Sequence, residues 1–406
     1  MQTNQTTIRN YSRSMKITRG PMDIPFLVVT LLLLGIGVIM VLSASYASAY
    51  YDLNNETGGS ATYYFTRQLI FAVMGVAVMY VCSRLPVSFY RRFSFFVLFI
   101  AIALLLAVLV IGTRVNGAKR WINLGFTTLQ PSEIAKVAVI LSFSVLICKY
   151  RNYMGTIKYG IMPFAIILAV IVGLLVLEPH LSASIIILLL GAIMLFAGGA
   201  RMFWFLAGGI GIAGIFIVLI NTMEYSSERI TAWLHPFEDM SDTGYQIVQS
   251  LYAVGSGGLY GLGLGNSRQK YLYLPEEHND FIFSIICEEL GFIGALLILT
   301  LFALLIIRGY WIALHSRDRY SFLVCTGVTS LLAIQVILNV AVCTNLVPCT
   351  GISLPFFSYG GTALLVQMAE MGIILSISRD IPVVKTVKRK SGSTAKRSNK
   401  ERSAEQ

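Results

Sequence analysis

The sequence predicts an all-α membrane protein of about ten transmembrane helices, with one large loop outside the membrane. Of its 406 residues, 56% are hydrophobic and 13% are charged, whereas soluble proteins average about 45–50% and about 25%. Such a chain cannot bury all its apolar surface in a water-soluble core. Long apolar runs recur along it, and its net charge of +11 is unevenly distributed among the connecting segments. We therefore interpret the charge as a signal of membrane orientation and expect no nucleic-acid partner.

The apolar runs define the expected helices. A helix needs roughly 20 mainly apolar residues to cross a bilayer. Ten runs meet this requirement, at 25–48, 68–86, 93–112, 132–149, 161–178, 181–199, 203–221, 280–307, 320–345 and 361–378.

Basic residues orient the predicted bundle. Of the 31 Lys and Arg residues, 23 fall on the side of the two termini, 7 fall on the other side, and Lys136 lies within a span. Because Lys and Arg are enriched on the cytoplasmic side, we expect both termini inside. The membrane domain is then 25–378, with a cytoplasmic tail 1–24 and a basic, Ser-rich, disordered tail 379–406.

Three segments on the outer side are unusual in length or composition, namely 112–131, 222–279 and 345–361. Long loops without repeats are typically functional, and the Gly, Pro and aromatic content predicts that these fold onto the helices. The glycine-rich stretch 253–270 lacks the strand–helix context of a nucleotide-binding loop. We interpret its glycines as permitting tight turns and close backbone approach.

Cations are unexpectedly common on the outer side, at Arg114, Lys119, Arg120, Arg229, Arg268 and Lys270. Lys136 lies inside a predicted span, and Glu133, on the same helix face, is its expected partner. One interpretation is an ordinary helix start at Gln130–Glu133 with Lys136 snorkelling to the interface. The other is a cationic site for the phosphate or diphosphate of an anionic lipid.

Acidic residues crowd the stretch "YLYLPEEHNDFIFSIICEELG". Helix capping would account for Asp280 alone. It does not account for Glu276, Glu277 and His278 beside it, or for Glu288 and Glu289 about 12 Å further along the helix. A half-buried carboxylate can take a proton from a sugar hydroxyl, so the stretch indicates group transfer on a lipid-linked anionic substrate. With no Asp-x-Asp motif, we predict no obligatory metal or cofactor and leave stimulation by a divalent cation open.

Three blocks carry a family resemblance: "NGAKRWINLGFTTLQPSEIAK", "GYQIVQSLYAVGSGGLYGLGLGNSRQKYLYLPEEHNDFIFSIICEELGFIG" and "TGISLPFFSYGG". In this order they resemble the SEDS family of bacterial cell-wall proteins (shape, elongation, division and sporulation), over roughly 25–380. The block around Asp280 is most similar to the division and sporulation members.

The resemblance implies a peptidoglycan glycosyltransferase in the bacterial plasma membrane, acting at its outer face and at the division septum. It would polymerise lipid II, a disaccharide-peptide on undecaprenyl diphosphate, onto a growing lipid-linked glycan with inversion. Asp280 would be the general base that activates the incoming 4-hydroxyl. The implied partners are a class B penicillin-binding protein, which supplies the transpeptidase, and other membrane proteins of the divisome.

The resemblance also assigns roles to side chains. The expected substrate-binding residues are Arg120, Trp121, Gln130, Glu133, Lys136, Glu276, His278, Ser358 and Gly360, and the expected supporting residues are Glu288, Arg268 and Lys270. The turn "EPHLSAS" departs from the family pattern, with His180 in place of an acid and Ser182 in place of glycine. This either ties activity to pH through His180 or is tolerated drift. Cys343 and Cys349 also depart from the pattern and could form a disulfide.

Two other functions stay open at this stage. A lipid II flippase needs a polar route through both leaflets, and Glu288, Glu289 and Glu370 lie near the middle of their predicted spans. A non-catalytic scaffold that recruits the penicillin-binding protein is the second, although the intact Asp280 and Lys136 disfavour it. Division and sporulation roles are not separable from the sequence.

Overall fold

The computed structural model describes residues 20–51, 57–115, 118–125, 127–205, 208–209, 214, 224–238 and 244–381. Its long helices are α2 (Ile24–Tyr51), α3 (Tyr63–Arg84), α4 (Val87–Ile111), α5 (Pro131–Lys149), α6 (Met162–Leu177), α7 (Leu181–Ala197), α11 (Ile282–Leu314), α12 (Arg319–Cys343) and α13 (Gly361–Ser378).

Among these described residues, eight helical stretches are long and apolar enough to cross a membrane, one of them formed by α6 together with the π-helix Ile157–Ile161 that precedes it. Helix α7 is a shorter apolar helix of 17 residues. The predicted all-α multi-pass membrane fold is confirmed. The predicted span 203–221 lies largely outside the described residues, as do 1–19 and 382–406 of the predicted tails.

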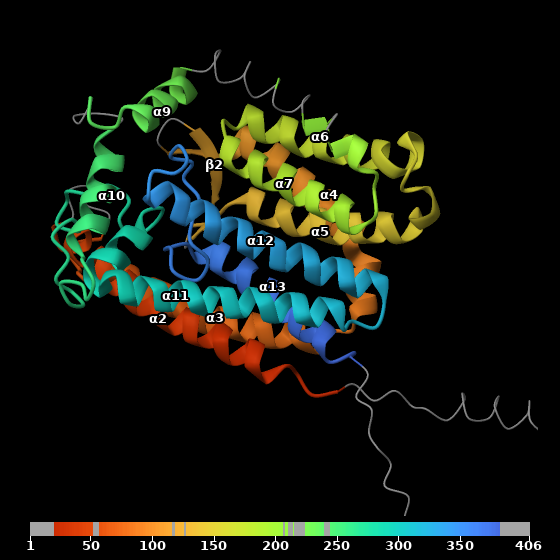
Figure 1. The fold of residues 1–406 in the computed structure, drawn as a ribbon, viewed down its shortest axis with the longest axis horizontal. Coiled ribbons are helices and arrows are strands. Elements are labelled where there is room, and N and C mark those ends of the chain that lie inside the picture. Colours follow the sequence, from red (N-terminus) through yellow and green to blue (C-terminus); the bar gives the residue numbers. More distant parts are fainter. Residues whose placement is uncertain are drawn as a thin grey trace, which may run out of the picture.

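The bundle has a buried centre and two flanks. Helices α2, α3, α11 and α13 lie on one side and α4, α5, α6 and α7 on the other, with α12 between them (Figure 1). In α5, α12 and α13, 78%, 72% and 67% of the most apolar stretch is buried, against 22–28% in α3, α4, α6 and α11. The polar residues of α5, α12 and α13 are therefore shielded from lipid.

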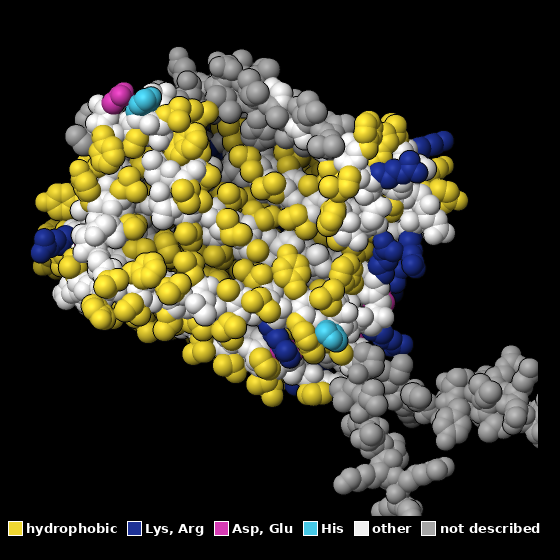
Figure 2. Space-filling model, in the orientation of Figure 1, with side chains coloured by type: hydrophobic (Ala, Val, Ile, Leu, Met, Phe, Trp, Pro, Cys, Tyr) yellow, Lys and Arg dark blue, Asp and Glu magenta, His cyan; other side chains and the backbone are white. Residues whose placement is uncertain are grey.

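The outer surface is apolar where a bilayer would contact it. Hydrophobic side chains cover most of the visible face, and Lys and Arg side chains gather toward its edges (Figure 2). Large exposed side chains such as Phe99 and Val110 are 71% and 79% exposed. An aqueous surface does not favour such side chains, but a hydrocarbon surrounding does.

A small antiparallel sheet, which the sequence analysis does not predict, lies between α4 and α5. It consists of β1 (Thr113–Val115), β2 (Ala118–Asn123) and β3 (Thr128–Leu129), in the order β1-β2-β3. The second hairpin pairs Ile122 with Leu129 and is closed by a hydrogen bond from the Leu124 amide to the Thr127 carbonyl, 2.8 Å. Strands of two to six residues are too short for an alternating pattern to reveal them.

Helix α11 is interrupted at Gly291, where φ is 66° and ψ is −172°. The glycine-rich segment that follows α10 (Tyr245–Ser256) fills the interruption. The amides of Phe292 and Ile293 donate to the carbonyls of Gly258 and Leu259, at 2.9 and 3.1 Å. In the opposite direction, the amides of residues 262 and 263 donate to the carbonyls of residues 288 and 289, both at 3.0 Å. Backbone groups that the break would leave unpaired are thus satisfied.

This exchange requires glycine at the crossing point. A Cβ on Gly261 would lie 2.2 Å from the Glu289 carbonyl oxygen, and one on Gly291 would lie 2.3 Å from the Gly261 nitrogen. Gly257 is equally restricted, because its Cβ would lie 1.9 Å from the Cys287 carbonyl oxygen. The interpretation of these glycines as allowing close backbone approach is confirmed.

Candidate active site

Asp280 lies two residues before α11 rather than inside the helix, where the predicted span 280–307 placed it. The helix N-cap is Phe281, and within the described residues no backbone amide donates to the Asp280 carboxylate. Capping therefore does not explain this acid. Its backbone is fixed instead by the buried Asn339 of α12, whose Nδ2 donates to the carbonyls of Asp280 and Ile352, at 2.8 and 2.7 Å.

The Asp280 carboxylate is half-buried in a charged surrounding. One of its oxygens faces the Cα of Gly351, where an added Cβ would lie 3.2 Å away. Burial, together with the nearby Glu276, raises the pKa of Asp280 to about 6, against the opposing effects of Arg229, Arg120 and His278. The group is mostly ionised at neutral pH and still basic, which suits a general base.

The segment 345–361 braces the turn that carries Asp280. The Tyr359 amide donates to the His278 carbonyl at 2.9 Å. Ser358 Oγ donates to the Asn279 carbonyl at 2.7 Å and accepts from the Leu354 amide, also at 2.7 Å. The predicted substrate-binding residue Ser358 thus lies in the support of the turn. Gly360 is close by, and its amide donates to Oε1 of Gln68 in α3 at 3.4 Å.

The predicted residues Glu276 and His278 both lie in this turn. Oε2 of Glu276 accepts from Asn279 Nδ2 at 2.6 Å. The His278 ring packs on Tyr64, with centroids 4.4 Å apart, and its Nδ1 is 3.4 Å from Glu277 Oε1. These contacts fix the orientation of the two side chains beside Asp280.

The predicted pairing of Lys136 with Glu133 is confirmed. The two side chains are 2.7 Å apart near the start of α5, and the two residues are only 3% and 8% exposed. Lys136 therefore does not snorkel to solvent. Pro131 is the first residue of α5 and Gln130 its N-cap, as predicted for the helix start. The Glu133–Lys136 pair also lies in electrostatic range of the buried Glu370 of α13.

Arg120 connects the small sheet to the turn between α6 and α7. Its guanidinium donates to the Pro179 carbonyl, and Nε2 of Gln130 lies 3.2 Å from Nε2 of His180 in the same turn. Trp121 is next along β2, where its carbonyl accepts from Thr113 Oγ1 at 3.2 Å. Because Arg120 also acts on Asp280 electrostatically, the sheet, this turn and the start of α11 face one region.

Glu288 and Glu289 lie elsewhere and are completely buried, both 0% exposed. Glu289 accepts from Ser43 Oγ at 2.6 Å and from Lys270 Nζ at 2.9 Å. Glu288 accepts from the amides of Arg268 and Gln269, at 2.9 and 3.4 Å. The residues expected to be supporting thus anchor the glycine-rich segment to α11 and α2.

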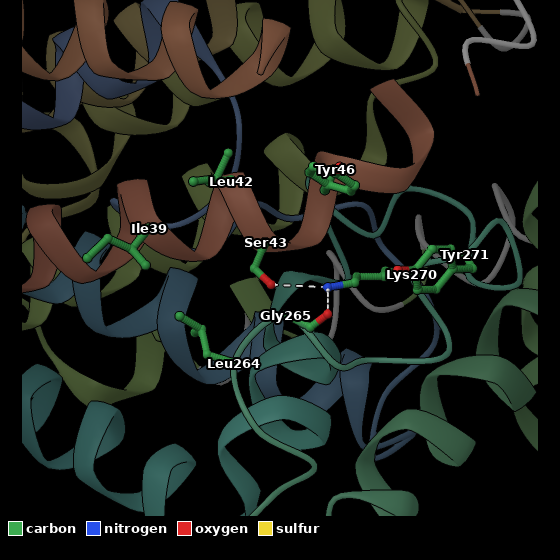
Figure 3. Close-up of a pocket in the computed structure, with 8 residues that line it drawn as sticks. All are labelled: Ile39, Leu42, Ser43, Tyr46, Leu264, Gly265, Lys270 and Tyr271. Carbon is green, nitrogen blue, oxygen red and sulfur yellow. Dashed lines mark hydrogen bonds between the residues drawn. The ribbon is translucent and has the colours of Figure 1, made fainter. Parts of the chain in front are cut away.

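Lys270 completes this anchor at the edge of a cavity of about 310 Å³. Figure 3 shows its amino group between Ser43 and the Gly265 carbonyl, to which it donates at 3.3 and 2.6 Å. Tyr46 and Tyr271 also line the cavity. Since Lys270 is already neutralised by Glu289, the cavity offers no uncompensated charge.

All six cysteines are free, so the disulfide considered between Cys343 and Cys349 is not formed. Cys343 Sγ lies 3.7 Å from the Asp280 carbonyl oxygen, and the Cys349 carbonyl accepts from Arg229 of α9 (Glu224–Leu234) at 2.8 Å. Within the described part of the chain, no three His, Cys, Asp or Glu side chains gather as metal ligands would.

Three residues of this region are missing from the sequence analysis: Gln68, Glu178 and Asn339. Gln68 and Asn339 are buried amides within apolar helices, and polar side chains in such helices are generally functional. That signal could have identified both. Glu178 is the last residue of the predicted span 161–178, and an ionisable side chain in an apolar span is a signal of the same kind.

The multi-pass helix bundle and its buried acid–cation site define a SEDS-type membrane protein, and comparison with known proteins agrees. The family model described as "Cell cycle protein", which covers FtsW, RodA and SpoVE, matches residues 24–381. The chain belongs to this family.

Relatives and solved structures resemble the chain over most of its length. It is 41% identical to stage V sporulation protein E of Bacillus subtilis over 88% of this chain and 97% of that protein. It is 38% identical to the probable peptidoglycan glycosyltransferase FtsW of Trichlorobacter lovleyi, over 88% and 93%. The predicted similarity to division and sporulation members is confirmed.

Among solved structures, one chain of a peptidoglycan synthase complex superimposes with a TM-score of 0.74 at 25% identity, covering 89% of this chain and 98% of that one. The rod shape determining protein RodA of Thermus thermophilus superimposes with a TM-score of 0.65 at 24% identity, over 89% and 98%. The second likeness concerns the fold alone.

Proposed function

We propose that the protein is a peptidoglycan glycosyltransferase that polymerises lipid II, with Asp280 as general base. The observation that carries this proposal is the state of the Asp280 carboxylate. It is half-buried, has a pKa near 6, and is free of hydrogen-bonding partners within the described residues, while Arg120, Arg229 and His278 act on it electrostatically. A base held ready beside cations suits transfer from a diphosphate-linked sugar.

These positions support the following reaction. Asp280 takes the proton of the incoming sugar 4-hydroxyl as its oxygen attacks the anomeric carbon of the growing strand. The bond from that carbon to the diphosphate oxygen breaks, and the lipid diphosphate leaves with the electron pair, so the anomeric configuration inverts. Arg120 supplies positive charge for the departing group, with Lys136 close by. Glu276 and His278 orient the base, and Trp121, Gln130 and Glu133 complete the substrate contacts.

The proposed orientation places this site at the outer face of the bacterial plasma membrane and both termini in the cytoplasm, in line with the distribution of Lys and Arg. The similar chain in a peptidoglycan synthase complex supports a class B penicillin-binding protein as partner. Similarity to both FtsW and SpoVE supports a place among division or sporulation proteins at the septum.

The test is glycan synthesis from labelled lipid II by the purified full-length protein with its cognate class B penicillin-binding protein. We expect polymer from the wild type and none from Asp280→Asn. Glu238→Gln is the control, because that acid is exposed and paired only with His235 among the described residues. Polymer from Asp280→Asn at the wild-type rate would reject Asp280 as the base.

A flippase is the alternative, and the buried acids bear on it. Glu288 and Glu289 are saturated by backbone amides, Ser43 and Lys270, so they offer no free charges along a polar route. If the wild type makes no polymer with an active partner present, transfer of labelled lipid II across proteoliposome membranes would decide between a flippase and a scaffold.

A further inference from the structure

A group of buried polar atoms without hydrogen-bond partners lies beside Arg120. In the described residues these atoms are Ser132 Oγ, Glu178 Oε1, His180 Nδ1 and Thr350 Oγ1. Glu178, Ser132 and His180 are only 1%, 2% and 7% exposed. Leaving a buried polar atom unsatisfied is costly, and such atoms are normally hydrogen-bonded. Four of them in one region therefore indicate a polar occupant.

Hydrogen bonds bring the segments that carry these atoms together. Gln130 at the start of α5 contacts His180, and Arg120 of β2 donates to Pro179, so the turn 178–180 is held between them. Ser182 donates to the Thr350 carbonyl, which joins the same turn to the segment 345–361. The group therefore belongs to the region that Asp280 faces, although none of its four atoms is used by the mechanism above.

The protonation of the group can be worked out. Nε2 of Gln130 is a donor, so Nε2 of His180 accepts and Nδ1 carries the proton. Burial, Arg120 and Lys136 lower the pKa of His180 to about 3, which keeps the ring neutral. Burial raises the pKa of Glu178 to about 8 against the opposing effect of Arg120, so this carboxyl is mostly protonated at neutral pH.

Every unpartnered atom of the group can therefore be a donor at neutral pH, or sits on a carboxyl that carries a proton. Such a lining selects an acceptor-rich, anionic occupant, and phosphoryl oxygens are acceptors only. We propose that protonated Glu178, together with the Nδ1–H of His180, holds a phosphoryl oxygen of the substrate's diphosphate. Glu178 is a substrate-binding residue in this role: it makes no covalent bond and keeps its proton throughout. The inference rests on the proposed function, which supplies the diphosphate.

The charges around Glu178 determine how it responds to pH. Arg120 on β2, which donates to the neighbouring Pro179 carbonyl, acts on Glu178 electrostatically and favours its ionisation. Lys136 of α5 acts on His180 in the same turn but is paired with Glu133, and both act on Glu370 of α13. Asp280, just before α11, is also within the electrostatic influence of Arg120. When Glu178 loses its proton, an added negative charge faces the diphosphate and substrate binding weakens.

Activity should then be bell-shaped in pH, with an acid limb near 6 from Asp280 and an alkaline limb near 8 from Glu178. His180 causes neither limb, because its pKa of about 3 keeps it neutral throughout. The sequence analysis allows the "EPHLSAS" turn either to tie activity to pH through His180 or to be tolerated drift. Under this proposal the titrating group of the turn is Glu178 instead of His180.

The first experiment is the pH dependence of glycan polymerisation by Glu178→Gln, because glutamine reproduces a protonated carboxyl at every pH. In the wild type we expect KM for lipid II to rise about tenfold per pH unit above about 8. In Glu178→Gln this alkaline limb should disappear while the acid limb stays. Glu370→Gln is the matched control, since it removes another buried carboxyl near Lys136 and should keep the alkaline limb. An unchanged alkaline limb in Glu178→Gln would overturn the inference.

The second experiment needs no turnover and separates the two proposals. Protection of the full-length protein from thermal unfolding by inorganic diphosphate is measured at about pH 7 and about pH 9. Wild type should be protected at the lower pH only, and Glu178→Gln at both. Equal protection of the wild type at both values would overturn the role of Glu178. Absence of polymer from wild type at every pH, with this protection pattern intact, would overturn the proposed polymerase alone.

Discussion

The acids at the two ends of one short stretch have opposite environments. Asp280 is half-buried, and its carboxylate has no hydrogen-bond or ion-pair partner among the described residues. Glu288 and Glu289, at most nine residues later, are fully buried and saturated by Ser43, Lys270 and backbone amides. Buried charges persist only where they are paired, or where function offsets the cost. The comparison therefore separates Asp280, an acid available for chemistry, from Glu288 and Glu289, two acids that stabilise the fold.

The largest expected effect is the loss of polymerisation rate when Asp280 is replaced. Asp280→Asn removes the base but keeps the shape of the side chain, so polymerisation should fall by about 10²–10⁴-fold. Since Asp280 contributes no side-chain hydrogen bond within the described residues, the unfolding temperature should stay close to that of the wild type. Rate and thermal unfolding are measured on the same preparation. A large loss of stability with the loss of rate would place Asp280 among the structural acids.

For Glu289, replacement should instead reduce the stability of the fold. Glu289→Gln leaves Lys270 buried without its counter-charge, which should cost about 3–5 kcal/mol of stability. Adding Lys270→Met should restore part of that loss, because an apolar side chain of similar length then fills the site. Thermal unfolding of the single and double variants in detergent checks this. If the double variant is less stable than Glu289→Gln alone, the pair is not the source of the stability.

The same comparison shows what the sequence could predict. The spans follow from local composition, and eight of the ten predicted ones are helices long enough to cross a membrane within the described residues. The Glu133–Lys136 pair follows from helical spacing and is confirmed. The environment of Asp280 depends instead on residues far away in the chain, including Asn339 and Arg120. Those contacts exist only in the folded bundle, and no local pattern separates Asp280 from Glu289.

A smaller loss of stability is expected where the glycine-rich segment crosses α11. Gly291→Ala forces a side chain into the positive-φ region and against the Gly261 nitrogen, at a cost of about 1–3 kcal/mol. Gly173→Ala of α6 is the control, since its Cβ would meet nothing within 4 Å. Thermal unfolding compares the two variants. Equal stability would mean that the crossing can widen freely, and that Glu288 and Glu289 alone hold the segment.

The smallest expected effect concerns the pKa of Asp280, which the adjacent acid Glu276 raises. A raised pKa means that the base form is lost as pH falls through about 6, so Glu276→Gln should shift the acid limb of polymerisation to lower pH, by less than about one unit. The expected change is therefore a few-fold gain in relative activity at about pH 5.5, with little change near neutrality. Glu277→Gln is the matched control, because that neighbouring acid contacts His278 and is not among the charges that shift Asp280. An acid limb that moves equally in both variants would mean that the whole turn has rearranged. An acid limb that stays in place in Glu276→Gln would assign the raised pKa of Asp280 to burial alone.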